Sequence, residues 1–199
     1  MTNKHYLIAD ARKEQIIKAA VAVLTETGYI NTSLAKIAKK ANISTGLISY
    51  HFSGKEDLMN NTLAFLVEEE KAMIKEKVEQ KQTYQDQLTA FIEASLAYQV
   101  IHRDNTKALL EIVFNARTPD NIPYYLVETD TDNELHDLLK VILHEGQQSN
   151  EFGEFDPQVV ATIIRGGISG SVSLPQYDID LNLEDYSEKM ISSILKMIK

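Results

Sequence analysis

Ser33–Phe52 reads SLAKIAKKANISTGLISYHF and predicts two short helices joined by a tight turn. Ser33 and Ser44 stand where the helices would begin, and serine is a favoured N-cap because its hydroxyl accepts a hydrogen bond from a free backbone N–H. Asn42, between the helices, is one of the few residues besides glycine that tolerate the left-handed conformation. The stretch therefore predicts a helix-turn-helix. The side chains expected in its small core are Ile37, Ala38, Ile43, Ile48 and Phe52.

The second of these helices has a largely polar outer face. An α-helix fits the major groove of DNA, and its first turns then meet the base edges. The pattern therefore favours DNA binding through this helix. Core packing is the alternative for two aromatic residues, and we favour it for Phe52 and a position at the groove rim for Tyr50. The residues that helical phase leaves outside are Thr45, Gly46, Leu47, Ser49 and Tyr50.

Helical periodicity continues through the rest of the chain, without a strand signal, an internal repeat or a low-complexity tract. Gly28 is expected to end the first helix, and Thr83 and Asp104 to cap later ones. Asp156-Pro157 is a strong helix start, because proline suits the first helical turn. We therefore predict an all-α chain of about nine helices. Besides the two helices above, the expected ranges are 12–27, 55–81, 83–102, 104–117, 124–148 with an irregularity at 129–133, 156–174 and 183–198.

The composition excludes several classes of protein. A chain of 199 residues is long enough for one or two small domains. It contains no cysteine, which excludes disulfides, zinc fingers and thiol nucleophiles. No apolar run reaches the roughly 18 residues of a membrane span, and residues 1–10 lack the apolar region of a signal peptide. We therefore expect a cytoplasmic protein with no membrane partner.

The sequence offers little for metal or cofactor chemistry. His136 and His144, with Glu145, invite a metal reading, but two helical turns separate the histidines by roughly 12 Å, which is too far for one ion. No nucleophile elbow and no glycine-rich phosphate loop is present. We therefore expect no metal site, no cofactor and no enzymatic activity.

Charge divides the chain unevenly. The net charge is −9, but residues 1–60 carry eight Lys and Arg against five Asp and Glu, a balance of +3. Residues 61–199 carry twelve against twenty-four, a balance of −12. Such a division indicates two modules, with an uneven acidic surface as the alternative. The predicted modules are 1–54, which holds the helix-turn-helix, and 55–199, connected by the long helix 55–81.

Five short motifs follow one another in residues 12–58: IIKAA at 16–20, GY at 28–29, TSLAKIA at 32–38, ANISTGLISYHF at 41–52 and KEDL at 55–58. In this order they resemble the DNA-binding domain of the TetR family of bacterial transcriptional regulators. The nine-helix layout is similar to that family over the full length. Asn42 stands where the family often has glycine, and Ser49 where it often has an aromatic residue that reads the groove.

The resemblance implies a set of contacts with double-stranded DNA. Thr32 and Ser33 match positions that bind phosphate from the second helix. Phosphate contacts are also implied for Tyr50, His51 and Lys55. Hydroxyls, helix N-termini and a lysine suit phosphate on chemical grounds as well. The positions that would face bases are Thr45, Gly46, Leu47 and Ser49.

The resemblance also implies roles for the acidic module. The last two helices of each chain would form a homodimer, and the small residues Gly166, Gly167, Gly170 and Ser171 would let another helix approach closely. Helices between about 84 and 150 would enclose a pocket for an unknown small-molecule effector. Core packing is the alternative for each candidate pocket residue. These candidates are Phe91, Tyr98, His102, Phe114, Arg117 and Tyr125.

Taken together, the sequence predicts a ligand-responsive regulator that binds a palindromic operator as a dimer and is released by its effector. A DNA-binding regulator without a small-molecule effector is the first alternative. A helical ligand-binding protein or enzyme with an incidental basic N-terminus is the second. Failure to retard any DNA at low salt would favour that second alternative.

Overall fold

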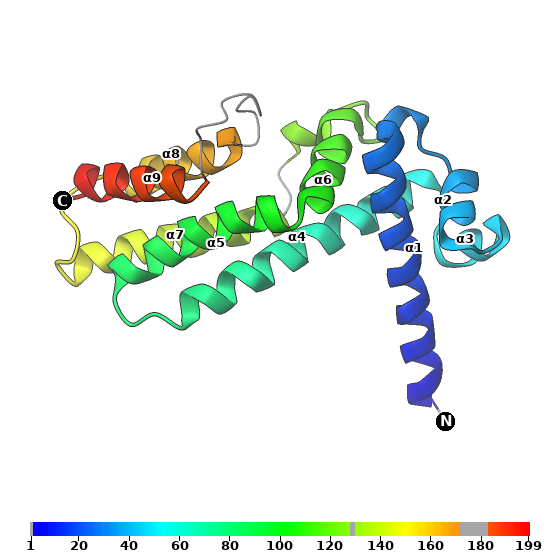
Figure 1. Cartoon of the computed structure of the whole chain (residues 1–199), viewed down its shortest axis with the longest axis horizontal. Helices are drawn as coiled ribbons and strands as arrows, with labels where there is room; N and C mark the ends of the chain where they lie inside the picture. Colours follow the sequence, from blue (N-terminus) through cyan, green and yellow to red (C-terminus); the bar gives the residue numbers. More distant parts are fainter. Residues whose placement is uncertain (1, 128–129, 172–182) are drawn as a thin grey trace. The chain divides into compact units, whose positions relative to one another are not determined.

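The computed structural model describes residues 2–127, 130–171 and 183–199, without the side chains of 2–9, 130–133 and 183. Within these residues the chain is all-α, with nine α-helices, one short 3-10 helix and an isolated bridge between Arg117 and Pro123. Two compact units divide it, one made of Met1–Val67 and His102–Glu128, the other of Glu68–Ile101 and Thr129–Lys199. Figure 1 shows the helices of each unit.

The first unit is built around α1 (Thr2–Asn31), α2 (Leu34–Ala41) and α3 (Thr45–His51). As predicted, Asn42 is left-handed (φ 54°), and the Ser33 and Ser44 hydroxyls accept bonds from the N–H groups of the third residue of each helix. The predicted core is also confirmed, with Ile43 partly buried at its edge. Its four buried members are 0–3% exposed: Ile37, Ala38, Ile48 and Phe52.

Two further elements complete this unit. The first part of α4 (Lys55–Glu79) begins with the Asp57 carboxylate accepting a hydrogen bond from the Ser53 N–H at 2.7 Å. α6 (Arg103–Asn115) packs along α1 and adds Ala108, Ile112 and Ala116 to the same core. The 3-10 helix η1 (Tyr124–Leu126) follows α6. The core of the helix-turn-helix is therefore continuous with residues that lie far downstream in the sequence.

The second unit is a helical bundle. α5 (Tyr84–Ile101) contacts α7 (Asp130–Gln148), α8 (Pro157–Ser171) and α9 (Leu183–Met197), and the remainder of α4 joins the same core through Ile74 and Val78. The predicted caps of α5 and α8 are confirmed. The Thr83 side chain accepts a hydrogen bond from the Asp86 N–H, and the Asp156 side chain accepts hydrogen bonds from the N–H groups of Gln158 and Val159.

Several boundaries differ from the sequence prediction, among them the end of α6 at Asn115 rather than 117. The first helix begins before residue 12; as predicted, Gly28 interrupts it (φ 72°, ψ 168°), and a short helical segment follows to Asn31. Asp104 is not a cap, because α6 already begins at Arg103. The helix predicted over 124–148, with an irregularity at 129–133, is divided into two separate elements, η1 and α7. α4 ends at Glu79 rather than 81. The predicted end of the helix 156–174 and the loop 175–182 lie outside the described residues.

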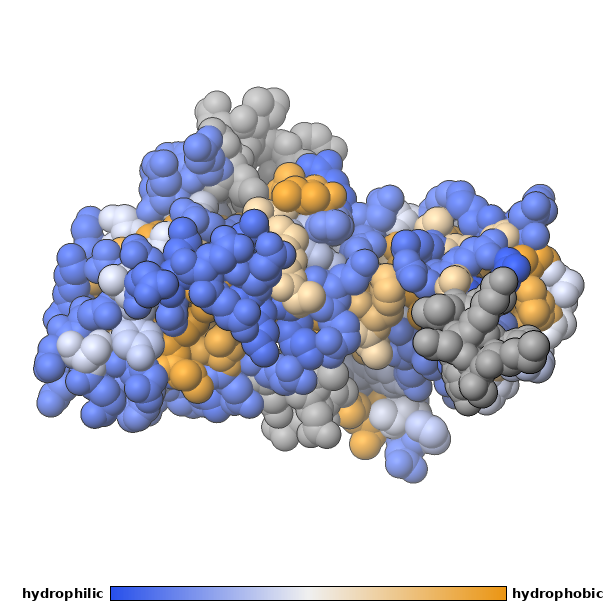
Figure 2. Space-filling view, turned by 90° about the horizontal axis from the view of Figure 1, so that it is seen from below, coloured by the Kyte–Doolittle hydropathy of each residue, from blue (hydrophilic) through white to orange (hydrophobic). Residues whose placement is uncertain are grey.

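The surface in Figure 2 is mainly hydrophilic, with separate hydrophobic patches. None of the helices in the described ranges combines the length and the apolar character that crossing a bilayer requires. The modules predicted at 1–54 and 55–199 do not coincide with the compact units, because α4 contributes to both units and α6 packs with α1.

Candidate nucleic-acid interface

The outer face of α3 is rigidly supported and open to solvent. Ile48 on its inner face is fully buried, while Tyr50 on its outer face is 82% exposed. The Tyr50 ring lies edge-on to His51, with 5.0 Å between ring centroids. Thr45, Gly46 and Ser49 are exposed as predicted, and Leu47 is half-buried. α3 therefore offers a small polar surface with one projecting aromatic ring, held by a buried core.

Glycine at position 46 keeps this surface flat. An added Cβ there would meet only the Ser44 hydroxyl, 3.9 Å away. The Ser49 hydroxyl donates to the Thr45 carbonyl at 3.2 Å, so Ser49 is held against its own helix. Its oxygen keeps lone pairs that can accept from a base or from water.

Thr32 and Ser33, at the start of α2, were both expected to contact phosphate, but they differ in their exposure to solvent. Ser33 is exposed and caps α2. Thr32 is 3% exposed, and its hydroxyl donates to the Gly28 carbonyl at 2.7 Å. Its N–H donates to the Tyr29 carbonyl at 3.2 Å. Thr32 therefore belongs to the turn between α1 and α2 rather than to the open surface, and of the two only Ser33 is presented to solvent.

Lys55, at the first turn of α4, is held inside the first unit. Its ammonium donates to the Tyr29 carbonyl at 2.7 Å and lies 4.5 Å from the centroid of the Tyr29 ring. Burial lowers the pKa of Lys55. Burial raises the pKa of the Tyr29 phenol, and nearby Tyr124 and Glu56 raise it further. An ammonium has three N–H bonds, so the Tyr29 carbonyl does not use all of them.

A basic groove of about 390 Å³ lies between α1 and α2. Lys36, Lys39 and Lys40 line its α2 side. Lys36 donates to the Asn31 carbonyl at 2.7 Å, and Lys40 pairs with Glu26. Lys39 is exposed and adds positive charge to this face. Helix spacing of three and four residues is the signal that places these lysines together.

The structure distributes the predicted effector residues between both units. Phe91 and Tyr98 of α5 are 0% and 3% exposed, in the second unit. The first unit contains the half-exposed His102 and the exposed Arg117. It also contains Phe114 and Tyr125, whose rings lie 5.9 Å apart. Only these last two are brought together by a ring contact, and the pocket they were expected to line stays a prediction.

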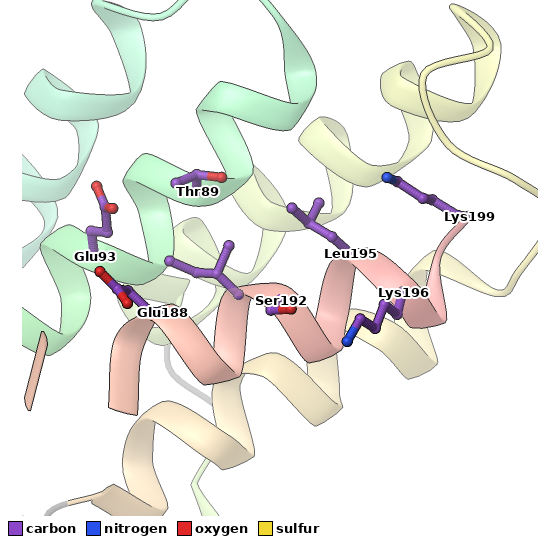
Figure 3. Close-up of a pocket in the computed structure, with 8 residues that line it drawn as sticks. Thr89, Glu93, Glu188, Ser192, Leu195, Lys196 and Lys199 are labelled. Carbon is purple, nitrogen blue, oxygen red and sulfur yellow. The ribbon is translucent and has the colours of Figure 1, made fainter. Parts of the chain in front are cut away.

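A groove of about 390 Å³ between α5 and α9 has lining residues of another kind (Figure 3). Glu93 and Glu188 lie at one end of it, and Lys196 and Lys199 at the other. Charges of both signs on its walls favour no single class of ligand. Over the described residues, no three His, Asp or Glu side chains gather as metal ligands would. His136 instead lies 2.9 Å from the Gln158 side-chain amide.

Comparison with known proteins bears on these helices first. Residues 16–62 match the family model of bacterial regulatory proteins of the tetR family. The HTH-type transcriptional regulator BetI of Vibrio campbellii is 35% identical over 71 residues, 36% of each chain. The chain thus aligns with little more than a third of the length of that relative. The probable HTH-type transcriptional regulator YttP of Bacillus subtilis is 28% identical over 143 residues, 70% of this chain and 67% of YttP.

Solved structures extend the likeness to nearly the whole fold. The transcriptional regulator FadR of Bacillus subtilis, in complex with stearoyl-CoA, is 26% identical with a TM-score of 0.72, covering 94% of this chain and 99% of FadR. PfmR of Thermus thermophilus, a TetR family transcriptional regulator, is 19% identical with a TM-score of 0.75, covering 91% and 94%. Residues 16–62, in α1–α4, are thus similar to bacterial regulatory proteins of the tetR family, and the described helices share the fold of these solved regulators.

Proposed function

We propose that the chain is a cytoplasmic transcriptional repressor that binds a palindromic DNA operator as a homodimer and is released by a small-molecule effector. The observation that carries the proposal is the outer face of α3. Tyr50 is 82% exposed beside the exposed Thr45, Gly46 and Ser49, while Ile48 anchors the same helix in the core. A rigid helix that presents hydroxyl groups and bare backbone to solvent is the kind of surface that enters a major groove and meets base edges.

The chemistry of this face suits a duplex. Hydroxyls of Thr45 and Ser49 can bond base edges, and the bare backbone at Gly46 allows close approach. Ser33 at the start of α2 and the lysines of that helix suit phosphates, because cations and helix N-termini attract them. Leu47, half-buried, is the apolar member of the face and suits a thymine methyl.

The homodimer is proposed to form through α8 and α9. On α8, Val159 and Ile163 are 54% and 48% exposed, and on α9 Met197 is 46% exposed. A Cβ added at Gly166 or Gly170 would meet no atom within 4 Å. This open face follows one side of α8, at spacings of three and four residues. Such a stripe lets a second helix approach closely and gives it apolar area to bury.

A two-fold dimer matches the form of the proposed operator. Two copies of α3 placed about 34–36 Å apart meet successive major grooves on one side of the duplex. The bound sequence then repeats as an inverted pair, since protein symmetry is mirrored in the DNA.

The effector is proposed to be an amphipathic anion with an acyl chain. In the second unit a groove of about 340 Å³ lies between α4 and α5. Met73, Ala90 and Ala94 are among its apolar lining residues, and its charged lining residues are Lys77, Lys81 and Glu93, two cations against one carboxylate. FadR of Bacillus subtilis was solved in complex with stearoyl-CoA, which has this chemistry.

Selection from a random-sequence duplex pool tests the DNA-binding proposal. We expect enrichment of an inverted repeat, and an unchanged pool at low salt would refute it. Ile163→Glu, placed on the open face of α8, is expected to give monomers in native mass spectrometry, with Lys75→Glu, an exposed position on α4 outside the proposed interface, as the control. Stearoyl-CoA is expected to release the selected DNA and acetyl-CoA to leave it bound. Equal behaviour of the two would refute the acyl effector and favour a regulator without one.

A further inference from the structure

The kink of α1 at Gly28 is closed by side chains from α6. In an uninterrupted helix the Tyr29 N–H would donate to the Thr25 carbonyl, four residues earlier. Here the Tyr29 N–H donates to the Glu111 carboxylate at 2.8 Å. The Thr25 carbonyl accepts from the Lys107 ammonium at 2.6 Å. One pair of side chains, four residues apart on α6, thus serves both halves of the interrupted helical bond.

The same carboxylate packs against the kink itself. A Cβ added at Gly28 would lie 3.3 Å from Glu111 Oε2. On the other side of the Tyr29 Cα, Lys55 donates to the Tyr29 carbonyl at 2.7 Å. The backbone of Tyr29 is therefore held by α6 through its N–H and by α4 through its C=O, which belong to the two peptide groups on either side of its Cα.

The backbone of Tyr29 leads directly to the start of α2. The Thr32 N–H bonds to the Tyr29 carbonyl and the Thr32 hydroxyl to the Gly28 carbonyl. Ser33, the cap of α2, is the next residue. A shift of the Tyr29 backbone would therefore move the end of α2 that is proposed to meet phosphate.

We propose that Lys107 and Glu111 of α6 are positioning residues for DNA binding. By bonding the N–H and C=O groups whose helical hydrogen bond is interrupted at Gly28, they fix the start of α2 against α1. This inference rests on the proposed function. In this proposal neither Lys107 nor Glu111 contacts DNA. They act through the Tyr29 backbone and the turn that follows.

The test compares Glu111→Ala, Lys107→Met and Glu111→Gln with Arg103→Ala, an exposed position on the same helix. The readouts are affinity for the selected DNA at several salt concentrations and hydrogen exchange at the Tyr29 amide. We expect Glu111→Ala and Lys107→Met to bind DNA about tenfold more weakly, because a backbone N–H or C=O left without a hydrogen-bond partner destabilises the arrangement that binds. The slope of affinity against salt stays unchanged, since no phosphate contact is removed.

Glu111→Gln is expected to rescue binding, because its amide oxygen still accepts the Tyr29 N–H. Exchange at that amide is expected to speed up in Glu111→Ala but not in Glu111→Gln. If Glu111→Ala does not fold, Lys107→Met and Glu111→Gln carry the comparison. Wild-type affinity in both disrupted variants, or a loss in Arg103→Ala as large as theirs, overturns the inference. A wild-type chain that binds no DNA refutes the proposed function instead. Hydrogen exchange at the Tyr29 amide then still tests whether Glu111 holds this N–H.

Discussion

Gly28→Ala is the most revealing substitution in the first unit. Gly28 has φ 72° and ψ 168°, a backbone region that is essentially limited to glycine. Forcing an alanine into it costs about 1–3 kcal/mol. Alanine also lowers the entropy of the unfolded chain, which offsets about 0.4–1 kcal/mol of that cost.

The new methyl group has a second effect. It lies 3.3 Å from the Glu111 carboxylate, which must move away from the Tyr29 N–H. A hydrogen bond to a charged group contributes about 1.5–3 kcal/mol, and part of it would be lost. Together these effects predict that Gly28→Ala lowers the free energy of unfolding of the first unit by roughly 2–4 kcal/mol.

Hydrogen exchange by mass spectrometry measures this loss where it occurs. Peptides from α1 and α2 should exchange faster, with peptides from α7 and α8 as an internal reference. Gly46→Ala is the matched control, since Gly46 lies in α3 with open space around an added Cβ. There alanine is expected to stabilise by about 0.5–1 kcal/mol. Equal protection of α1 in Gly28→Ala and wild type would refute the reasoning about the kink.

Three other perturbations have defined outcomes. Gly146→Ala should destabilise the second unit by more than 2 kcal/mol in urea unfolding, because the new Cβ would lie 2.2 Å from the Phe152 ring; a wild-type midpoint would contradict this. Ser44→Ala should cost about 1 kcal/mol through the lost cap of α3, with Ser53→Ala as the control. Because burial lowers the pKa of Lys55, the unfolded chain binds more protons as pH rises toward 10.5. Wild type should therefore gain stability relative to Lys55→Met over that interval, and a flat difference would exclude the burial effect.

Local signals in the sequence were sufficient for the helix-turn-helix. Ser33, Asn42 and Ser44 act on backbone groups within a few residues of themselves, so their roles can be inferred without tertiary information. The buried faces of α2 and α3 follow from helical phase for the same reason. Leu47 departs from that phase only in part, since it is half-buried rather than fully exposed.

Other features depend on contacts that no local pattern encodes. Glu111 lies 82 residues from Tyr29, and its spacing from Lys107 on α6 is that of any helical charge pair. The family resemblance predicts a phosphate contact for Thr32 as for Ser33, but the buried Thr32 hydroxyl donates to the Gly28 carbonyl. Within the helix predicted over 124–148, with an irregularity at 129–133, the first residues form η1 instead, because helical periodicity alone does not distinguish one turn of 3-10 helix from an α-helix.

The central claim is that the outer face of α3 reads DNA, and selection from a random duplex pool with Leu47→Ala tests it most directly. The account predicts that this variant enriches an inverted repeat that differs from the wild-type sequence at one position in each half-site, where the leucine met a base. An identical enriched sequence, bound with unchanged or uniformly lower affinity, would contradict it.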